Sequence, residues 1–130
     1  MTMELYLLGW TLVLAIVQIM LPAMYRNRET GLDYNAGPRD KEGPPMGVIT
    51  GRLFRAQKNL FETLPLFIGA ILIAHVGGQE GAMTAWGAWL YFLARIVYVP
   101  LYAMGIPYVR SMVWGISLLG LVLVILPVIF

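Results

Sequence analysis

The chain has 130 residues and a net charge of +2; 59% of its residues are hydrophobic, 12% are charged, and the mean hydropathy is +0.74. A soluble domain of this size needs more polar surface, so the composition predicts a membrane protein. The sequence has no cysteine and one histidine, which excludes a disulfide framework or thiolate metal site and argues against a histidine-rich one. The small net charge gives no reason to expect nucleic-acid binding.

Four apolar segments are long enough to cross a hydrocarbon core, which takes about 20 helical residues. We predict them at residues 5–24, 53–76, 82–104 and 109–130. Together they predict an all-α fold, an integral membrane four-helix bundle in which residues 1–130 form a single domain.

The connections between these segments predict an orientation. The connection over residues 25–51 is rich in glycine, proline and charge and cannot bury a core of its own, so it is predicted to be a loop. It carries four cationic residues, Arg26, Arg28, Arg39 and Lys41, whereas residues 77–81 contain no lysine or arginine. The positive-inside rule therefore places the loop in the cytoplasm and both termini on the non-cytoplasmic side. The compact chain favours a bacterial inner membrane; a eukaryotic copy would lie in the endoplasmic reticulum.

The second segment begins with a stripe of polar residues. Arg52, Arg55, Asn59 and Glu62 follow at spacings of three, four and three, which places them on one helix face. Charged groups are costly in lipid, so this face should turn toward the bundle interior and mark a site.

The third segment carries a matching stripe, which consists of Tyr91, Arg95, Tyr98 and Tyr102. Arg95 and Glu62 should lie at similar depths, so we predict that they form a buried ion pair. That pair could fix the register of the bundle without touching a ligand. Tyr91 is interpreted as a packing residue.

The two stripes predict a cavity that opens toward the cytoplasm, with Arg110 at its mouth. Guanidinium groups bind carboxylates, and Glu62 can accept from an ammonium group. A tripeptide with two carboxylates and one ammonium suits this set, while the apolar walls would admit a lipophilic co-substrate from the bilayer.

The block Arg55-Ala-Gln57-x-Asn59-x-x-Glu62-x-x-Pro65 resembles the second-helix signature of the MAPEG family, the membrane-associated proteins in eicosanoid and glutathione metabolism. The likeness continues through Ala94-Arg95-x-x-Tyr98-x-x-x-Tyr102 and through Arg110-Ser111. The resemblance implies four-helix subunits that assemble as homotrimers and use glutathione as a co-substrate, with no metal.

The resemblance also implies a role for each matching residue. Arg55, Asn59, Glu62, Tyr98 and Tyr102 would bind glutathione between neighbouring subunits, Gln57 would reach the ligand of the adjacent subunit, and Arg110 would stabilise the catalytic thiolate. Arg52 is either a further ligand residue or an anchor at the membrane surface, the role also preferred for Arg26, Arg28 and Arg39. Some members place tyrosine directly after the signature glutamate, where this chain has Thr63.

We therefore expect a microsomal glutathione transferase-like enzyme, a transferase or peroxidase acting on lipophilic electrophiles or lipid hydroperoxides. Its expected partners are its own copies, membrane lipids, glutathione and a lipophilic second substrate. One alternative is a non-catalytic scaffold or lipid-binding protein on the same fold. A small transporter or channel subunit is a third interpretation, but the outer halves of the segments lack the polar path that transport requires.

Overall fold

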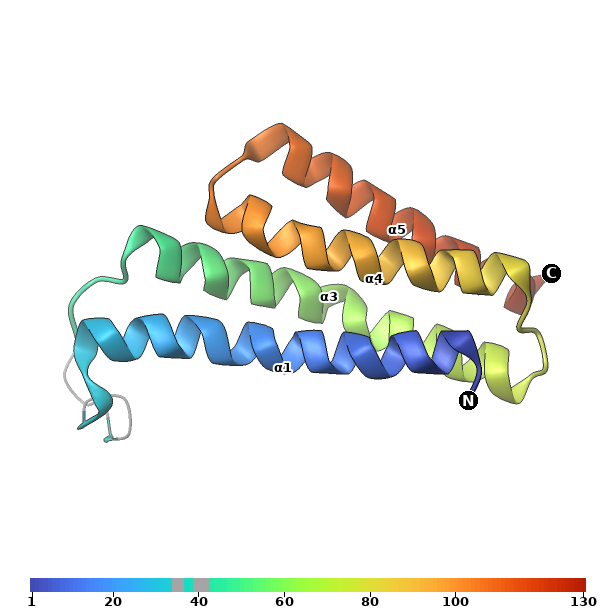
Figure 1. Cartoon of the computed structure of the whole chain (residues 1–130), viewed down its shortest axis with the longest axis horizontal. Coiled ribbons are helices and arrows are strands. Elements are labelled where there is room, and N and C mark those ends of the chain that lie inside the picture. The colour runs from blue at the N-terminus through green and yellow to red at the C-terminus, as the bar shows by residue number, and fades with distance from the viewer. Residues whose placement is uncertain (34–36, 39–42) are drawn as a thin grey trace.

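The computed structural model describes residues 1–33, 37–38 and 43–130 of the chain. Four long helices dominate this part, namely α1 (Met3–Thr30), α3 (Val48–Val76), α4 (Ala82–Ala103) and α5 (Pro107–Ile129) (Figure 1). All four are long and apolar enough to cross a membrane. The predicted all-α fold with four such helices is therefore confirmed for the described residues, in which no strand occurs.

The bundle has two chemically different ends. Both chain termini and the short connection over residues 77–81 lie at one end, here called the terminal end (Figure 1). The other end, here called the Arg-rich end, holds the connection between α1 and α3 and the turn between α4 and α5. Arg26, Arg28, Arg52, Arg55 and Arg110 all belong to helix segments near this end.

The helices α1 and α3 extend into the range predicted to be a loop. The helix α1 ends at Thr30 rather than near residue 24, and α3 begins at Val48 rather than near residue 53. The extra turns of α1 are polar, and the extra turn of α3 contains Thr50, Gly51 and Arg52, so a hydropathy pattern alone stops short of them. Arg39 and Lys41, two of the cations used to predict the orientation, lie outside the described residues.

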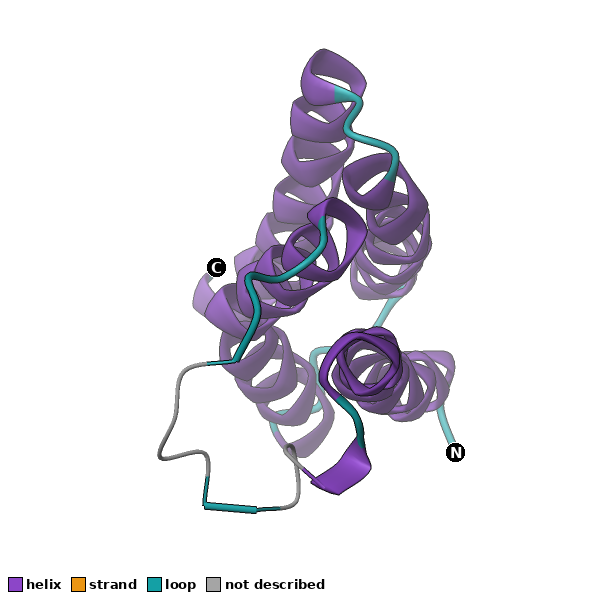
Figure 2. Cartoon of the chain, turned by 90° about the vertical axis from the view of Figure 1, so that its left-hand side faces the viewer, coloured by secondary structure: helices purple, strands orange, loops and turns teal. Residues whose placement is uncertain are grey.

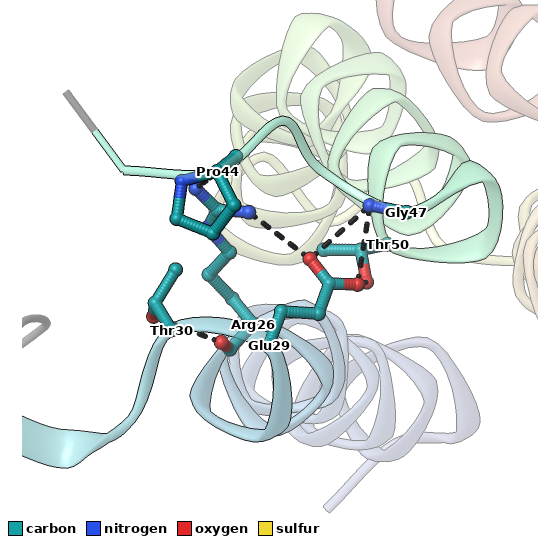
Figure 3. A network of polar contacts seen from close by, with 6 residues as sticks. All are labelled: Arg26, Glu29, Thr30, Pro44, Gly47 and Thr50. Atoms are coloured by element: carbon teal, nitrogen blue, oxygen red, sulfur yellow. Dashed lines mark hydrogen bonds and ion pairs between the residues drawn. The ribbon is translucent and has the colours of Figure 1, made fainter.

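A polar network explains why these two helices extend so far (Figure 3). The Glu29 carboxylate accepts hydrogen bonds from the backbone N–H of Gly47 at 3.1 and 3.2 Å and from the Thr50 hydroxyl at 2.6 Å. Gly47 is the N-cap of α3 and has no side chain to cap it, so Glu29 supplies the missing acceptor and a favourable negative charge. Arg26 pairs with Glu29 at 3.0 Å and donates to the Pro44 carbonyl at 2.6 Å, which fastens the end of the connection to α1.

The closest approach between helices joins α4 to α5. A Cβ atom added to Gly87 would lie 2.5 Å from the Gly120 carbonyl oxygen, and one added to Gly120 would lie 2.6 Å from the Gly87 carbonyl oxygen. Only glycine allows two helix backbones to come this near, as is common where helices meet in membranes. Seen along the bundle from the Arg-rich end (Figure 2), α1 lies on the opposite side from the α4–α5 turn.

The core lies where α1, α3, α4 and α5 meet. Its centre holds Leu60, Phe67 and Val124, all fully buried. Tyr91 is also fully buried; its ring stacks on Phe67 with centroids 4.1 Å apart, and its hydroxyl forms a hydrogen bond of 2.8 Å with the Thr63 hydroxyl. Tyr91 is thus a packing residue with a satisfied hydroxyl, as predicted.

Candidate functional site

Arg95 is the innermost cation of the candidate site. Arg95 lies on α4 and its side chain is completely buried; its Nη1 donates a hydrogen bond of 2.8 Å to Asn59 Oδ1 on α3. The guanidinium also lies over the Tyr98 ring, 4.4 Å from the ring centroid, in a cation–π contact. Arg95 therefore joins residues of both predicted stripes.

The predicted ion pair between Glu62 and Arg95 does not form within the described chain. Arg95 takes the Asn59 amide as its partner, and no carboxylate lies within 4.0 Å of it among the described residues. The reason is geometric, since Asn59 and Glu62 are three positions apart and so differ by about 60° around α3. The bundle turns Asn59 inward and leaves Glu62 exposed.

Tyr102 brings the two outer arginines together. The Arg110 guanidinium at the start of α5 lies 4.6 Å from the Tyr102 ring centroid, and the Arg55 guanidinium on α3 lies 5.9 Å from it. The Tyr98 ring meets the Tyr102 ring edge-on at 5.6 Å. A continuous set of contacts thus runs from Asn59 through Arg95 and both tyrosines to Arg55 and Arg110, and we call these six residues the arginine–tyrosine cluster.

The cluster concentrates positive charge without a paired acid. Among the described residues, ion pairs within 4.0 Å join only Arg26 to Glu29 and His75 to Glu80, and neither pair belongs to the cluster. Three guanidinium groups therefore contact two aromatic rings without an ion pair to any described carboxylate. Such a group of donors is suited to binding an anion, above all a carboxylate that can take two hydrogen bonds from one guanidinium.

Comparison with known protein families identifies this arrangement. The sequence model of the MAPEG family matches residues 7–130. The chain belongs to the MAPEG family. Together with its four apolar helices, this membership makes the protein an integral, multi-pass membrane protein. Comparisons with curated proteins and with solved structures find no match.

Like Glu62, the predicted site residues Arg52 and Gln57 of this MAPEG protein lie outside the cluster. Arg52 Nη1 donates to the Ala103 carbonyl oxygen at 3.2 Å, so this arginine caps the end of α4. Its guanidinium lies against Gly105, which has φ +74° and could not carry a Cβ atom without meeting Arg52 at 2.8 Å. Gln57 forms no side-chain hydrogen bond with any described residue, and its predicted contact with an adjacent subunit stays a prediction.

One face of α3 carries charge that the chain itself does not cover. Arg55, Lys58 and Glu62 are all exposed, although the helix is apolar enough to span a membrane. Sequence reasoning missed Lys58, because it followed the residues of the family signature and passed over the position between them. Helical periodicity alone would have found it, since Lys58 lies three residues after Arg55 and four before Glu62.

The interior holds a second polar residue that sequence reasoning did not use. Gln18 on α1 is only 2% exposed, and both its amide oxygen and its amide nitrogen lack a hydrogen-bond partner within the described residues. An amide in the middle of an apolar helix was the available signal.

The surroundings of the cluster give no sign of a metal centre in the described part of the chain, where no group of three or more His, Cys, Asp and Glu side chains could hold an ion. A groove of about 590 Å³ lies at the terminal end and is lined by Met3, Ala82, Ala85, Trp86, Trp89 and Leu93. Its lining is apolar and contains no residue of the cluster. The cavity predicted at the Arg-rich end stays a prediction.

Proposed function

We propose that this MAPEG protein is a glutathione-dependent membrane enzyme, a transferase or peroxidase that acts on lipophilic electrophiles or lipid hydroperoxides. The observation that carries the proposal is the contact of the Tyr102 ring with the guanidinium groups of both Arg55 and Arg110, with no carboxylate paired to either among the described residues. An anionic ligand would supply the missing negative charge.

The functional groups of glutathione match what the cluster leaves available. Its two carboxylates can each accept hydrogen bonds from a guanidinium, those of Arg55 and Arg110 being accessible. Asn59 uses its amide oxygen for Arg95, so its NH₂ group remains to donate to the ligand. Glu62 is exposed and can accept from the ligand ammonium. Tyr98 and Tyr102 would line the site with rings and hydroxyls.

Arg110 is the proposed catalytic residue. A cysteine thiol has an ordinary pKa of about 8.5, so a nearby guanidinium would favour the thiolate at neutral pH. The thiol proton would pass to water, and the thiolate would attack the electrophile, forming a carbon–sulfur bond as the leaving group departs with its electron pair. With a hydroperoxide, the thiolate would take the outer oxygen and release an alcohol. A second glutathione would then convert the resulting sulfenic acid into the disulfide and water.

A homotrimer would complete the site. The exposed charges of Arg55, Lys58 and Glu62 would be costly in lipid, so neighbouring copies of the chain are the proposed cover for this face. By the positive-inside rule we assign the Arg-rich end to the cytoplasm, where glutathione is found. Both termini would then lie on the other side of a bacterial inner membrane.

Glutathione titration of the purified protein in detergent tests this proposal. We expect thiolate absorbance to rise with bound glutathione and a chlorinated nitrobenzene then to be converted into its conjugate. S-methylglutathione, which has no free thiol, is the matched control and should compete for binding without producing the absorbance. Binding without thiolate formation or turnover would indicate the alternative, a non-catalytic scaffold; absence of binding would refute both the site and the enzyme.

A further inference from the structure

The polar atoms of Gln18 and Arg95 are buried and incompletely paired. Gln18 Nε2 and Oε1 and Arg95 Nε and Nη2 have no hydrogen-bond partner within the described residues, although Gln18 is 2% exposed and Arg95 is not exposed at all. An unpaired polar group inside a protein destabilises the fold, and more so when it is charged, so these four atoms call for a partner.

The helix faces show that these two side chains point toward the same interface. At the terminal end, Thr84 on α4 donates a hydrogen bond of 3.0 Å to Glu4 on α1. Gln18 lies within about 40° of Glu4 around α1, and Arg95 lies within about 20° of Thr84 around α4. Both helices run from the terminal end to the Arg-rich end (Figure 1), so the contact that joins Glu4 to Thr84 aligns the faces carrying Gln18 and Arg95.

Their depths in the bundle also agree. Measured from the contact of Glu4 with Thr84, Gln18 lies about 21 Å along α1 and Arg95 about 17 Å along α4. A second reference is the hydrogen bond between Glu29 and Thr50 at the opposite end. From there, Gln18 lies about 17 Å back along α1, and Asn59, the partner of Arg95, lies about 14 Å along α3. Two independent references thus place Gln18 beside the inner part of the arginine–tyrosine cluster.

The chemistry of the unpaired atoms selects their partner. Arg95 offers only donors, but Gln18 offers one donor and one acceptor. An anion such as chloride would satisfy the donors and leave Gln18 Oε1 unpaired. Water can accept from the Arg95 guanidinium and donate to Gln18 Oε1 at the same time, and buried water commonly bridges such groups.

We propose that Gln18 and Arg95 bind internal water that connects α1 to the arginine–tyrosine cluster. The water would accept hydrogen bonds from Nε and Nη2 of Arg95, while Nη1 keeps its hydrogen bond to Asn59. The water would thus link α1 to the cluster, to which α1 contributes no residue of its own. The bridge does not depend on glutathione, so it can be tested whether or not the proposed function holds.

A thermal double-mutant cycle tests the bridge, with Gln18→Met, Arg95→Met and the combined variant measured in the same detergent. If water links the two residues, Gln18→Met lowers the Tm by several degrees, and the combined variant falls little further than Arg95→Met alone. Thr11→Val is the matched control, since the Thr11 hydroxyl is equally buried on α1 but already donates to its own helix at Leu7. Its effect should add to that of Arg95→Met.

Two results would overturn the bridge. A rise in Tm for Gln18→Met would show a dry interior, in which removal of the amide relieves an unpaired group; this arm remains informative even if Arg95→Met does not fold. A Tm of the parent protein that increases in chloride relative to gluconate at equal ionic strength, and loses this dependence in Gln18→Met, would assign the site to an anion instead of water.

Discussion

The terminal end of the bundle and the arginine–tyrosine cluster both contain buried or half-buried polar groups, but these groups differ in the partners they have. At the terminal end each acid has a donor: Thr84 donates to Glu4 at 3.0 Å, and Thr2 donates to Glu80 at 2.7 Å. His75 Nδ1 adds a contact of 3.0 Å to Glu80. In the cluster, the guanidinium groups of Arg55 and Arg110 contact the Tyr102 ring and form no ion pair within 4.0 Å with any described residue.

This difference separates polar groups that stabilise the fold from polar groups that remain available to a ligand. Groups that satisfy one another at the terminal end tie α1 to α4 and need nothing further. Cations that lack an acid keep a free energy of interaction available for a ligand that brings one. We therefore expect substitutions at the terminal end to change stability and substitutions in the arginine–tyrosine cluster to change ligand chemistry.

The largest expected effect is at Arg110. Arg110→Ala should retain glutathione binding but lower turnover by about 100-fold, equivalent to about 2.7 kcal/mol, because the thiolate loses its nearest cation. Arg110→Lys is the matched control and should recover part of the rate, since it restores the charge without the planar fork. The pH dependence of thiolate absorbance and of the conjugation rate measures both. An unchanged thiolate titration in Arg110→Ala would move this role to another arginine.

Arg55 should affect affinity rather than chemistry. Arg55→Ala removes a charge-assisted contact worth about 1.5–3 kcal/mol, so the Kd for glutathione should rise about 10-fold to 150-fold. Isothermal titration with S-methylglutathione measures this without turnover. Arg28→Ala removes the same charge from the same end, where Arg28 lies over the Tyr25 ring at 5.7 Å, and should leave the Kd nearly unchanged. Equal effects of the two substitutions would point to general electrostatic attraction instead of a site.

Thr84 should show the opposite behaviour. Thr84→Val leaves the buried Glu4 carboxylate without its hydroxyl donor, so the free energy of unfolding should fall by about 1–3 kcal/mol with no change in glutathione affinity. Thr84→Ser keeps the hydroxyl and should retain most of the stability. Denaturation in mild detergent and ligand titration measure the two quantities separately; a loss of affinity in Thr84→Val at unchanged stability would remove the distinction between the two ends.

The smallest expected effect is a pH dependence that comes from Glu80, which lies in the connection outside the membrane-spanning helices. Burial raises the pKa of its carboxyl, but hydrogen bonds from Thr2 and His75 outweigh this, so the pKa lies below its ordinary value of 4.5. A lowered pKa in the folded protein stabilises the fold above pH 4.5, and this contribution is lost as the pH falls through the lowered value.

Comparison of the parent protein with Glu80→Gln isolates that contribution from those of other acids. The difference in Tm between the two proteins should shrink as the pH falls below the ordinary glutamate pKa. A difference that stays constant down to about pH 3 would show that the Glu80 contacts do not depend on its charge.

Hydropathy was sufficient to predict the four helices, because each apolar stretch is long enough to cross a membrane and little else can bury it. It could not predict that α1 continues to Thr30, since the last turns are held by Glu29 contacts with Gly47 and Thr50, about twenty positions away in the sequence. Such an extension depends on tertiary contacts, which local composition does not contain.

The candidate site could likewise be predicted only in part. Helical periodicity placed Arg95 opposite the stripe of α3, but it could not decide between Asn59 and Glu62, because that choice depends on the rotation of two packed helices. It also gave no reason to connect Gln18 with Arg95, since the proposed bridge between them depends on the packing of α1 on α4. The contacts of Tyr102 with Arg55 and Arg110 agree with the predicted grouping, whereas the ligand that the group binds stays a prediction.

Arg52 has a consequence for how the site is held together. By holding the Ala103 carbonyl and lying against Gly105, it fixes the turn that leads into α5 to the same helix that carries Arg55. Arg52 thus links the turn before Arg110 to the helix that carries Arg55 and helps to hold these two helix ends together. A side chain at position 105 would displace the Arg52 guanidinium and strain a backbone with φ +74°, so it should loosen this link even with every residue of the cluster unchanged.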